Sequence, residues 1–378
     1  MIIGKNIISV LLFLMMICLQ YPAKGFSDIY TWQAIFMNEH ARNDLRQYVR
    51  ENSDARRKWL DIQAQAEQYL KDAPSPVAVI HYEGLLNNHP DRVKTVASLM
   101  DMRKLAHFYY AWIITREPVY QEKIKEYVVA WTNTYQATGN PINENKLEAI
   151  YLTYYITREN FTRQEQEKVD GWIGEVADAE INRQGVPMNN WQTKRIKLLL
   201  YSGIILNDES YKQYALQKFR EYINHSLRSD GSSYDLEQRD ALAYHVSGLK
   251  PLILLGIVYD QFKSEFAEQF NPFTHVSANK SSIKKSVDFV NDYATGKKQH
   301  REWVNSKVKL DHERAKAGLA EYQKGKVYEP AESLELYEQA MYFEDDYQKI
   351  IDAICLEEQV SDHCHGWMYY VVKAIKRK

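Results

Sequence analysis

The sequence predicts an all-α fold built of helical hairpins. Apolar and aromatic residues recur at spacings of three and four along most of the chain, which is the period of a helix with one buried face. Short polar turns separate these segments, and runs of alternating β-branched residues are missing. Because a helix must bury its apolar stripe against a neighbour, successive helices joined by tight turns pack as hairpins.

Residues 1–25 are expected to be a signal peptide that precedes the folded part of the chain. Lys5 provides a positive start, residues 7–19 are apolar but short for a membrane span, and residues 23–25 have the small-any-small pattern of a signal-peptidase site. We therefore predict a single mature domain over residues 26–378, located in the periplasm or secreted. A retained membrane anchor and a lipoprotein are the alternatives.

Eight segments of the mature chain show helical periodicity. They are expected at residues 55–70, 93–115, 118–135, 145–157, 163–182, 193–207, 209–226 and 241–262. The turns between them contain the proline, glycine and aspartate residues that end helices. Residues 332–377 are also expected to be helical and to pack outside the main group. No motif recurs at a constant period, so a regular solenoid is not expected.

The composition argues against a nucleic-acid binder with a broadly basic surface. The formal net charge is −2 at pH 7, and the loss of Lys5 and Lys24 with the signal peptide makes it −4. An acidic polymer would therefore be bound by a local cluster of cations. We expect no second apolar run of membrane-spanning length, so the mature chain is expected to be soluble. Its length fits one large domain or two smaller ones.

Two cysteines remain in the mature chain. Cys355 and Cys364 are close in sequence, and in an oxidising compartment they are expected to form a disulfide that fixes the C-terminal segment. His363-Cys364-His365 is alternatively a set of metal ligands, but no partner cluster with zinc-site spacing appears elsewhere. We expect neither a metal nor another cofactor.

Three polar clusters interrupt the helical pattern, at residues 189–191, 239–245 and 293–303. Together they supply amides, cations, tyrosines and histidines, the mixture that chemistry on a carboxylated sugar polymer needs. The residues expected to contact such a substrate are Asn189, Asn190, Trp191, Arg239, Tyr244, His245, Tyr293, Lys297, His300 and Arg301.

In their order along the chain, these motifs resemble the alginate lyase superfamily of bacterial polysaccharide lyases. The resemblance extends from about residue 55 to about residue 310, and it rests on Asn189-Asn190-Trp191, Asp230-Gly231-Ser232, Arg239 to His245, Tyr293 to Lys298 and Val304-Asn305-Ser306. It implies an (α/α) toroid, an incomplete barrel of helical hairpins. It also implies cleavage of alginate or a related β-1,4-linked polyuronate such as glucuronan by β-elimination.

The chemistry of β-elimination explains this set of residues. The enzyme must neutralise the uronate carboxylate before the neighbouring C5 proton can leave, and the amides of the paired asparagines can do so. A base and an acid then act on C5 and O4, and His245, Tyr244 and Tyr293 are the candidates, with Arg239 as the nearby charge. If residues 241–253 are helical, His245 lies at the edge of their apolar stripe, within reach of a substrate.

The sequence departs from the better-known alginate lyases at two positions. Trp191 stands where their Asn-Asn-His motif has its histidine, and Val246 replaces the asparagine of their Tyr-His-Asn segment. The chain resembles instead the divergent alginate and glucuronan lyases in which a histidine such as His245 shares proton transfer with a separate downstream tyrosine. Tyr293 and Tyr244 are therefore equal candidates for the catalytic tyrosine.

Each assignment has a structural alternative. The two asparagines could cap the helix that follows them, His245 could be a buried core residue, and the cations of residues 297–301 could be a solvated surface. Residues 311–314 are interpreted as the start of a surface helix.

Two other functions fit the same clusters. A glycoside hydrolase would need two carboxylic acids across the scissile bond, for which the candidates are Asp235, Glu237 and Asp240. A protein without activity would capture oligouronates through the cations. Product mass separates the enzymes, because hydrolysis adds water and elimination does not.

Overall fold

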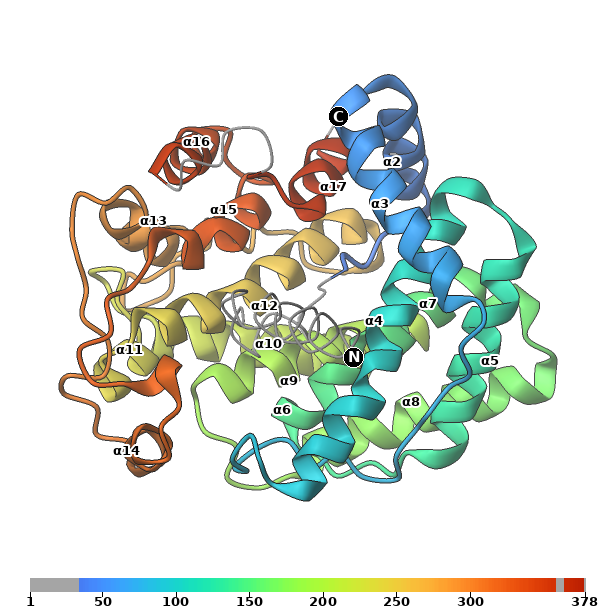
Figure 1. Cartoon of the computed structure of the whole chain (residues 1–378), viewed down its shortest axis with the longest axis horizontal. Coiled ribbons are helices and arrows are strands. Elements are labelled where there is room, and N and C mark those ends of the chain that lie inside the picture. Colours follow the sequence, from blue (N-terminus) through green and yellow to red (C-terminus); the bar gives the residue numbers. More distant parts are fainter. Residues whose placement is uncertain (1–33, 358–363, 377–378) are drawn as a thin grey trace, which may run out of the picture. The chain divides into compact units, whose positions relative to one another are not determined.

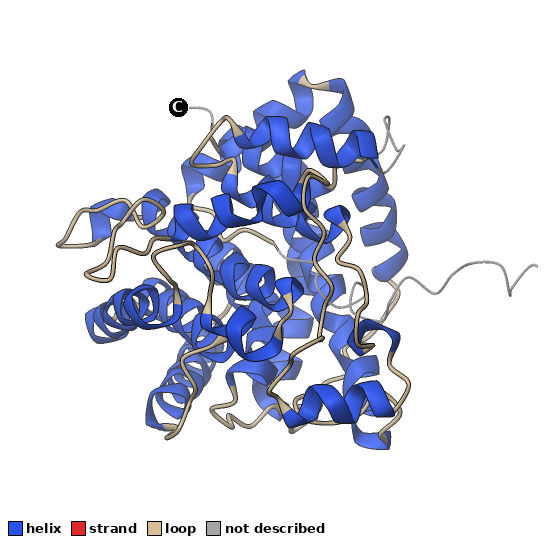
Figure 2. Ribbon diagram, turned by 90° about the vertical axis from the view of Figure 1, so that its left-hand side faces the viewer, coloured by secondary structure: helices blue, strands red, loops and turns tan. Residues whose placement is uncertain are grey.

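The computed structural model describes residues 34–357 and 364–376, which belong to one compact unit, Gln33–Lys378. The predicted signal peptide lies outside the described residues. Every regular element in this part of the chain is a helix, apart from two isolated bridges that pair Leu227 with Ser233 and Arg301 with Val327. The prediction of an all-α fold is therefore confirmed (Figure 2).

The helices follow the hairpin pattern expected from the sequence, with additional short elements between them. In chain order they are α2 (Glu39–Glu51), α3 (Ser53–Tyr69), α4 (Pro90–Thr115), α5 (Pro118–Thr134), α6 (Pro141–Glu144), η1 (Asn145–Leu147), α7 (Glu148–Thr157), η2 (Arg158–Asn160), α8 (Arg163–Asn182), α9 (Asn190–Ile205), α10 (Glu209–Ser226), α11 (Tyr234–Arg239), α12 (Leu242–Gln261), η3 (Lys263–Glu265), α13 (Ile283–Ala294), α14 (Lys309–Lys316), η4 (Ala320–Tyr322), η5 (Pro330–Ser333), α15 (Leu334–Ala340), α16 (Tyr347–Glu357) and α17 (Trp367–Ile375).

Contacts between helices run in a circuit. Along the described chain, α4 contacts α7, α7 contacts α9, α9 contacts α12, α12 contacts α15, α15 contacts α17, α17 contacts α2, and α2 contacts α4 (Figure 1). The other long helices pack on members of this circuit: α3 and α5 on α4, α8 and α10 on α9, α13 on α12, and α16 on α15. This arrangement is the (α/α) toroid implied by the family resemblance.

Helices α4, α7, α9 and α12 are buried around most of their circumference, which explains why their apolar residues do not form a narrow stripe. Helix α12 is the extreme case. It is long and apolar enough to cross a membrane by composition, so the expectation that no second run reaches that length is wrong. However, 78% of its apolar window is buried inside the protein, as expected for the core helix of a packed domain.

The C-terminal helices take part in the circuit, which corrects the prediction that residues 332–377 pack outside it. Trp367 at the start of α17 packs edge-on against Tyr110 of α4, with ring centroids 5.4 Å apart. A disulfide joins Cys355 of α16 to Cys364, just before α17, as predicted. Apolar side chains on all sides of α17 are buried, so its position inside the fold follows from its composition.

A tight turn before α11 sets the direction of the chain as it enters the polar clusters. Gly231 has a φ of +93°, and a Cβ at this position would lie 2.6 Å from the carbonyl oxygen of Lys285. Asp230 accepts hydrogen bonds from the backbone N–H and the hydroxyl of Ser232, at 2.9 and 2.8 Å. Only glycine fits this turn, because it combines a left-handed conformation with close backbone contact.

Candidate active site

The two asparagines of the first cluster have different roles. Asn189 is the N-cap of α9, and its side-chain oxygen accepts the N–H of Trp191 at 2.9 Å. Asn190 follows as the first residue of the helix and is only 8% exposed. Its side-chain oxygen has no hydrogen-bond partner among the described residues. The capping alternative therefore holds for Asn189, whereas the side-chain oxygen of Asn190 is buried without a partner in the described structure.

Asp235 of α11 joins the first cluster to the second. Its carboxylate accepts the backbone N–H of Asn190 at 2.9 Å and is buried, with 2% exposure. Burial raises the pKa of Asp235 to about 6, an effect that the charges of Arg239 and Lys194 oppose. A residue of α11 thus fixes the start of α9, although 45 positions separate Asp235 from Asn190 in the sequence.

The second cluster contains a sharp corner between α11 and α12. Asp240 has a left-handed backbone, with a φ of +50°, and it ends α11. Because the helix is interrupted there, Arg239 and Tyr244 can face each other. The guanidinium carbon of Arg239 lies 4.0 Å from the centroid of the Tyr244 ring. Both side chains are partly exposed.

Residues of α14 and η4 complete this group. Arg239 is paired with the buried carboxylate of Asp311, which also accepts the hydroxyl of Ser306 at 2.8 Å. Arg314 donates to the hydroxyl of Tyr244 at 3.2 Å and to that of Tyr322 at 2.9 Å. The segment interpreted from the sequence as a surface helix therefore supplies two buried site residues, Asp311 and Arg314.

The third cluster supports the helix that carries Tyr244. Glu302 is 1% exposed and accepts the backbone N–H groups of Leu242 and Ala243, at 2.7 and 3.3 Å, so it caps the start of α12. Burial raises the pKa of Glu302 to about 7. Trp303, in the same segment, packs edge-on against Tyr244 with ring centroids 5.6 Å apart.

Among the described residues, no contact brings the predicted residues of the third cluster to Asn190. Tyr293 lies in the last turn of α13 rather than in a loop, and its ring lies 6.2 Å from that of His300. His300 is half-buried, with its Nε2 3.2 Å from the backbone oxygen of Asp240. Lys297 and Arg301 are exposed, as expected for a solvated surface.

His245 lies in the core, which corrects the expectation that it reaches a substrate. It is 1% exposed, with Nδ1 2.8 Å from the hydroxyl of Ser233 and Nε2 2.9 Å from the carbonyl oxygen of Ser286. Burial lowers the pKa of His245 to about 4, so the ring is neutral at pH 7. Helix α13 covers the edge of the apolar stripe on which this histidine lies, and both ring nitrogens are occupied.

The carboxylates considered for a hydrolase do not form a pair across a substrate site. Asp235 is buried beneath Asn190. Glu237 is exposed and forms two hydrogen bonds of 2.7 Å with Arg228. Asp240 accepts the backbone and side-chain N–H groups of Asn305, at 2.9 and 3.0 Å. Each carboxylate is engaged in holding local structure.

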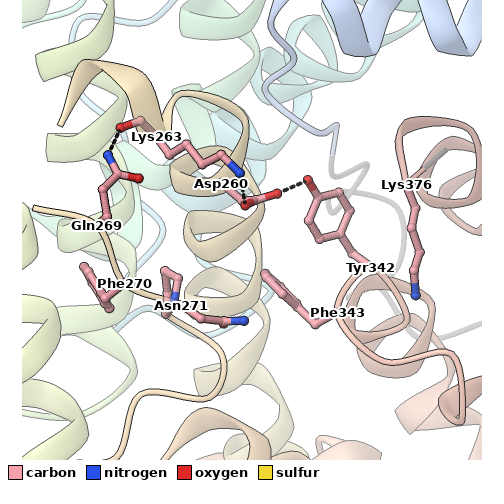
Figure 3. Close-up of a pocket in the computed structure, with 9 residues that line it drawn as sticks. Asp260, Lys263, Gln269, Phe270, Asn271, Tyr342, Phe343 and Lys376 are labelled. Atoms are coloured by element: carbon pink, nitrogen blue, oxygen red, sulfur yellow. Dashed lines mark hydrogen bonds and ion pairs between the residues drawn. The ribbon is translucent and has the colours of Figure 1, made fainter. Parts of the chain in front are cut away.

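A pocket of about 520 Å³ lies elsewhere, at the end of α12 and beside the turn after α15, and none of the predicted site residues lines it (Figure 3). Its charged groups are paired. Asp260 accepts the hydroxyl of Tyr342 at 2.7 Å and lies 3.6 Å from Lys263. Lys376 lies 2.8 Å from the carboxylate of Asp345. The polar cluster around Asn190 and Tyr244 is therefore the better candidate site.

No group of three or more His, Cys, Asp or Glu side chains suited to a metal ion occurs in the part of the chain that the structure describes. Cys364 is bonded to Cys355, so its thiolate is not available as a ligand. His363, the first residue of the alternative metal motif, lies outside the described residues.

Trp191, the third residue of the first cluster, is half-buried beside α8. The guanidinium carbon of Arg183 lies 5.7 Å from its ring centroid. Sequence reasoning missed Lys194, Asp311, Arg314 and Tyr322. The position of Lys194 could have been found, because a residue four places after Asn190 lies on the same face of a helix. No local pattern marks the other three.

The comparisons with known proteins agree with the all-α fold. Residues 45–300 match the family described as alginate lyase, and no curated protein sequence matches the chain. A solved alginate lyase from Bacteroides ovatus is 11% identical, with alignment over 85% of this chain and 95% of that one and a TM-score of 0.63. Alginate lyase A1-III from Sphingomonas species A1 is 17% identical over 78% and 93% of the two chains, with a TM-score of 0.54. A variant of A1-III complexed with a tetrasaccharide is 18% identical, with alignment over 70% of this chain and 79% of that one and a TM-score of 0.52.

Because the family match spans more than half of its residues, this chain belongs to the alginate lyase family and is a polysaccharide lyase.

Proposed function

We propose that this lyase cleaves alginate or a related β-1,4-linked polyuronate, with Asn190 and Arg239 at the uronate carboxylate and Tyr244 transferring the proton. The main support is the amide of Asn190, which is buried and has an unpartnered oxygen in the described structure. A buried polar group without a partner is costly unless a ligand satisfies it. An amide can turn to present either its N–H groups or its oxygen.

Tyr244 is the proposed base and acid because of the charges around its hydroxyl. Arg314 donates a hydrogen bond to the Tyr244 oxygen, and Arg239 lies over the ring. Two guanidinium groups therefore lie beside the oxygen that is proposed to receive the C5 proton. Asp311 holds Arg239, while Glu302 and Trp303 support the first turn of α12.

The proposed elimination consumes no water molecule. The Tyr244 oxygen takes the proton from C5, and the electron pair of the C5–H bond forms the double bond between C4 and C5. The C4–O4 bond breaks, and the departing O4 receives a proton from the tyrosine hydroxyl. Hydrogen bonds from Asn190 and Arg239 to the carboxylate stabilise the charge that develops next to C5. The site thereby binds the transition state more tightly than it binds the substrate.

The test is to mix the purified protein with alginate and to follow the ultraviolet absorbance of unsaturated chain ends. Replacement of Tyr244 by Phe should reduce the rate by at least about 100-fold, since general acid-base groups contribute about 10² to 10⁴. Replacement of Tyr293 by Phe is the matched comparison, because it removes the same hydroxyl from the second candidate. A large loss in the Tyr293 variant and none in the Tyr244 variant would reverse the assignment.

The preferred uronate is part of the proposal. Alginate is the leading substrate because of the family, and a glucuronan-like polymer is the second. A panel of polymannuronate, polyguluronate and glucuronan, each assayed for unsaturated ends at the same sugar concentration, ranks them by kcat/KM. No absorbance with any of these polymers would contradict a polyuronate substrate.

We also propose that the chain is exported and cleaved after Gly25, so that it works in the periplasm or outside the cell. The pattern of residues 1–25 supports this proposal, and the disulfide is typical of an oxidising compartment. The mass of the protein recovered from the periplasm or the medium tests it. A full-length chain confined to the cytoplasm would contradict it.

A further inference from the structure

Lys194 lies one helical turn after Asn190, on the same face of α9. Its ammonium group is 3.3 Å from the carbonyl oxygen of Asn190. The side chain is partly exposed. No carboxylate lies within 4.0 Å of this ammonium among the described residues. A cation without a counter-ion therefore lies beside the unpartnered amide of Asn190.

The next lysine of the same helix shows the usual arrangement. Lys197 is 1% exposed, and its ammonium lies 2.7 Å from the carboxylate of Glu148. Lys212, which is also buried, has Glu265 at 3.6 Å. Buried cations in proteins are normally paired in this way, because an uncompensated charge is costly away from water. Lys194 lacks such a partner in the described structure.

A second lysine, Lys146, also lacks a carboxylate partner in the described part of the chain. Lys146 in η1 is partly exposed, and its ammonium lies 3.7 Å from the ring centroid of Tyr82, with no carboxylate within 4.0 Å in the described part of the chain. Burial lowers the pKa of Lys146 to about 8, with a further contribution from the charge of Arg92 and an opposing one from Glu83.

Element η1, which carries Lys146, packs against α9, so the charge of Lys146 acts on Lys194. Burial lowers the pKa of Lys194 to about 7, and the positive charges of Lys146 and Lys197 lower it further. Asp235 of α11 and Glu83 of the loop before α4 act in the opposite direction. Helix α9, η1, α11 and this loop thus place two unpaired cations near one buried amide. A bound anion would relieve the repulsion and would accept hydrogen bonds from the two ammonium groups and from the amide N–H of Asn190.

We propose that Lys194 and Lys146 form a subsite that binds a carboxylate of the polyuronate next to Asn190. This inference rests on the proposed function, because that function identifies the anion as a uronate. It replaces the cations of residues 297–301 as the place where the chain recognises substrate charge. Lys194 touches the substrate in this arrangement, and Lys146 supports it from the neighbouring element.

The experiment measures binding separately from turnover. In a Tyr244→Phe background, tetramers of mannuronate and guluronate are titrated calorimetrically into the protein. Lys194→Met should weaken binding by about 10-fold to 100-fold, as expected for a lost hydrogen bond between charged groups. Lys194→Arg should restore most of the affinity. Lys168→Met, which removes an exposed lysine on α8, is the matched control and should leave the affinity unchanged.

The outcomes are distinguishable. Unchanged affinity in both Lys194→Met and Lys146→Met would overturn the subsite. If Lys194→Met does not fold, as judged by circular dichroism, Lys146→Met carries the test. A neutral cellulose tetramer serves as a second probe, and an equal loss of its binding would also overturn the inference. If the protein with Tyr244 intact produces no unsaturated ends but binding still falls in Lys194→Met, the proposed reaction fails and the subsite stands.

Discussion

Replacing His245 by alanine is expected to lower stability and to leave the chemical step of the folded enzyme in place. The imidazole is buried, and it bonds Ser233 and Ser286 at 2.8 and 2.9 Å. Its removal leaves two polar groups without their partner and an empty volume in the core. With about 1 to 3 kcal/mol for each buried group left unsatisfied, the free energy of unfolding should fall by about 3 kcal/mol at pH 7.

The loss of stability in the His245→Ala variant should depend on pH, because His245 itself titrates. Burial lowers its pKa from 6.5 to about 4 in the folded protein. The unfolded chain therefore binds this proton at a higher pH than the folded chain does. The stabilisation by neutral His245 is complete above pH 6.5 and is lost as the pH falls to about 4. At about 1.4 kcal/mol for each pH unit, the loss reaches about 3 kcal/mol.

The assay is urea unfolding of the wild type and the alanine variant, followed by circular dichroism at pH 7 and at pH 4.5. The stability difference should be large at pH 7 and should shrink at the lower pH, because only the wild type contains the titrating group. Initial rates of elimination, corrected for the folded fraction, should be similar. A variant with an unchanged urea midpoint and a rate at least about 100-fold lower would refute the structural role.

Three further predictions follow from the contacts described above. Asp311→Asn should lower kcat by about 10-fold to 100-fold because Arg239 loses its charged partner; steady-state kinetics with an unchanged kcat would contradict this. Oligouronate affinity in the Tyr244→Phe background should fall as the pH rises from 6 to 9, because burial lowers the pKa of Lys194 to about 7 and the neutral amine does not attract a carboxylate; calorimetry showing a flat profile would argue against a charged contact. Gly231→Ala should destabilise the protein by about 1 to 3 kcal/mol, since its φ is +93° and the new Cβ meets a backbone oxygen; an equal melting temperature would contradict the strain.

Most of the fold could be predicted from the sequence because helical periodicity is a local property. The segments that form α3, α5, α8 and α10 have one apolar face and clear end signals, and their expected bounds lie within a few residues of the observed ones. The position of α15 and α17 could not be predicted in the same way. Periodicity shows that a helix buries a face, but it does not identify the helix against which that face packs.

The site was predictable where motifs are local and not where partners are distant. Asn190, Arg239 and Tyr244 lie in short polar clusters, and the structure connects them through Asp235, Asp311 and Arg314. The contact between Arg239 and Asp311 joins residues 72 positions apart, which no local pattern reveals.

His245 was misplaced for a related reason. An apolar stripe indicates the buried side of a helix, whereas the extent to which α13 covers the edge of that stripe is a tertiary property. Both of its ring nitrogens bond residues of other segments, Ser233 before α11 and Ser286 in α13.

The contact between α2 and α17 has a consequence for how the protein is made. The first of these helices ends at Glu51 and the second begins at Trp367, so the circuit joins segments that leave the ribosome at very different times. Until α17 emerges, the apolar surface that it covers on α2, α3 and α15 stays exposed, and a contact of such long range adds to the entropy lost in folding. Nascent chains that stop before Trp367 should therefore be digested by protease more readily than the finished protein.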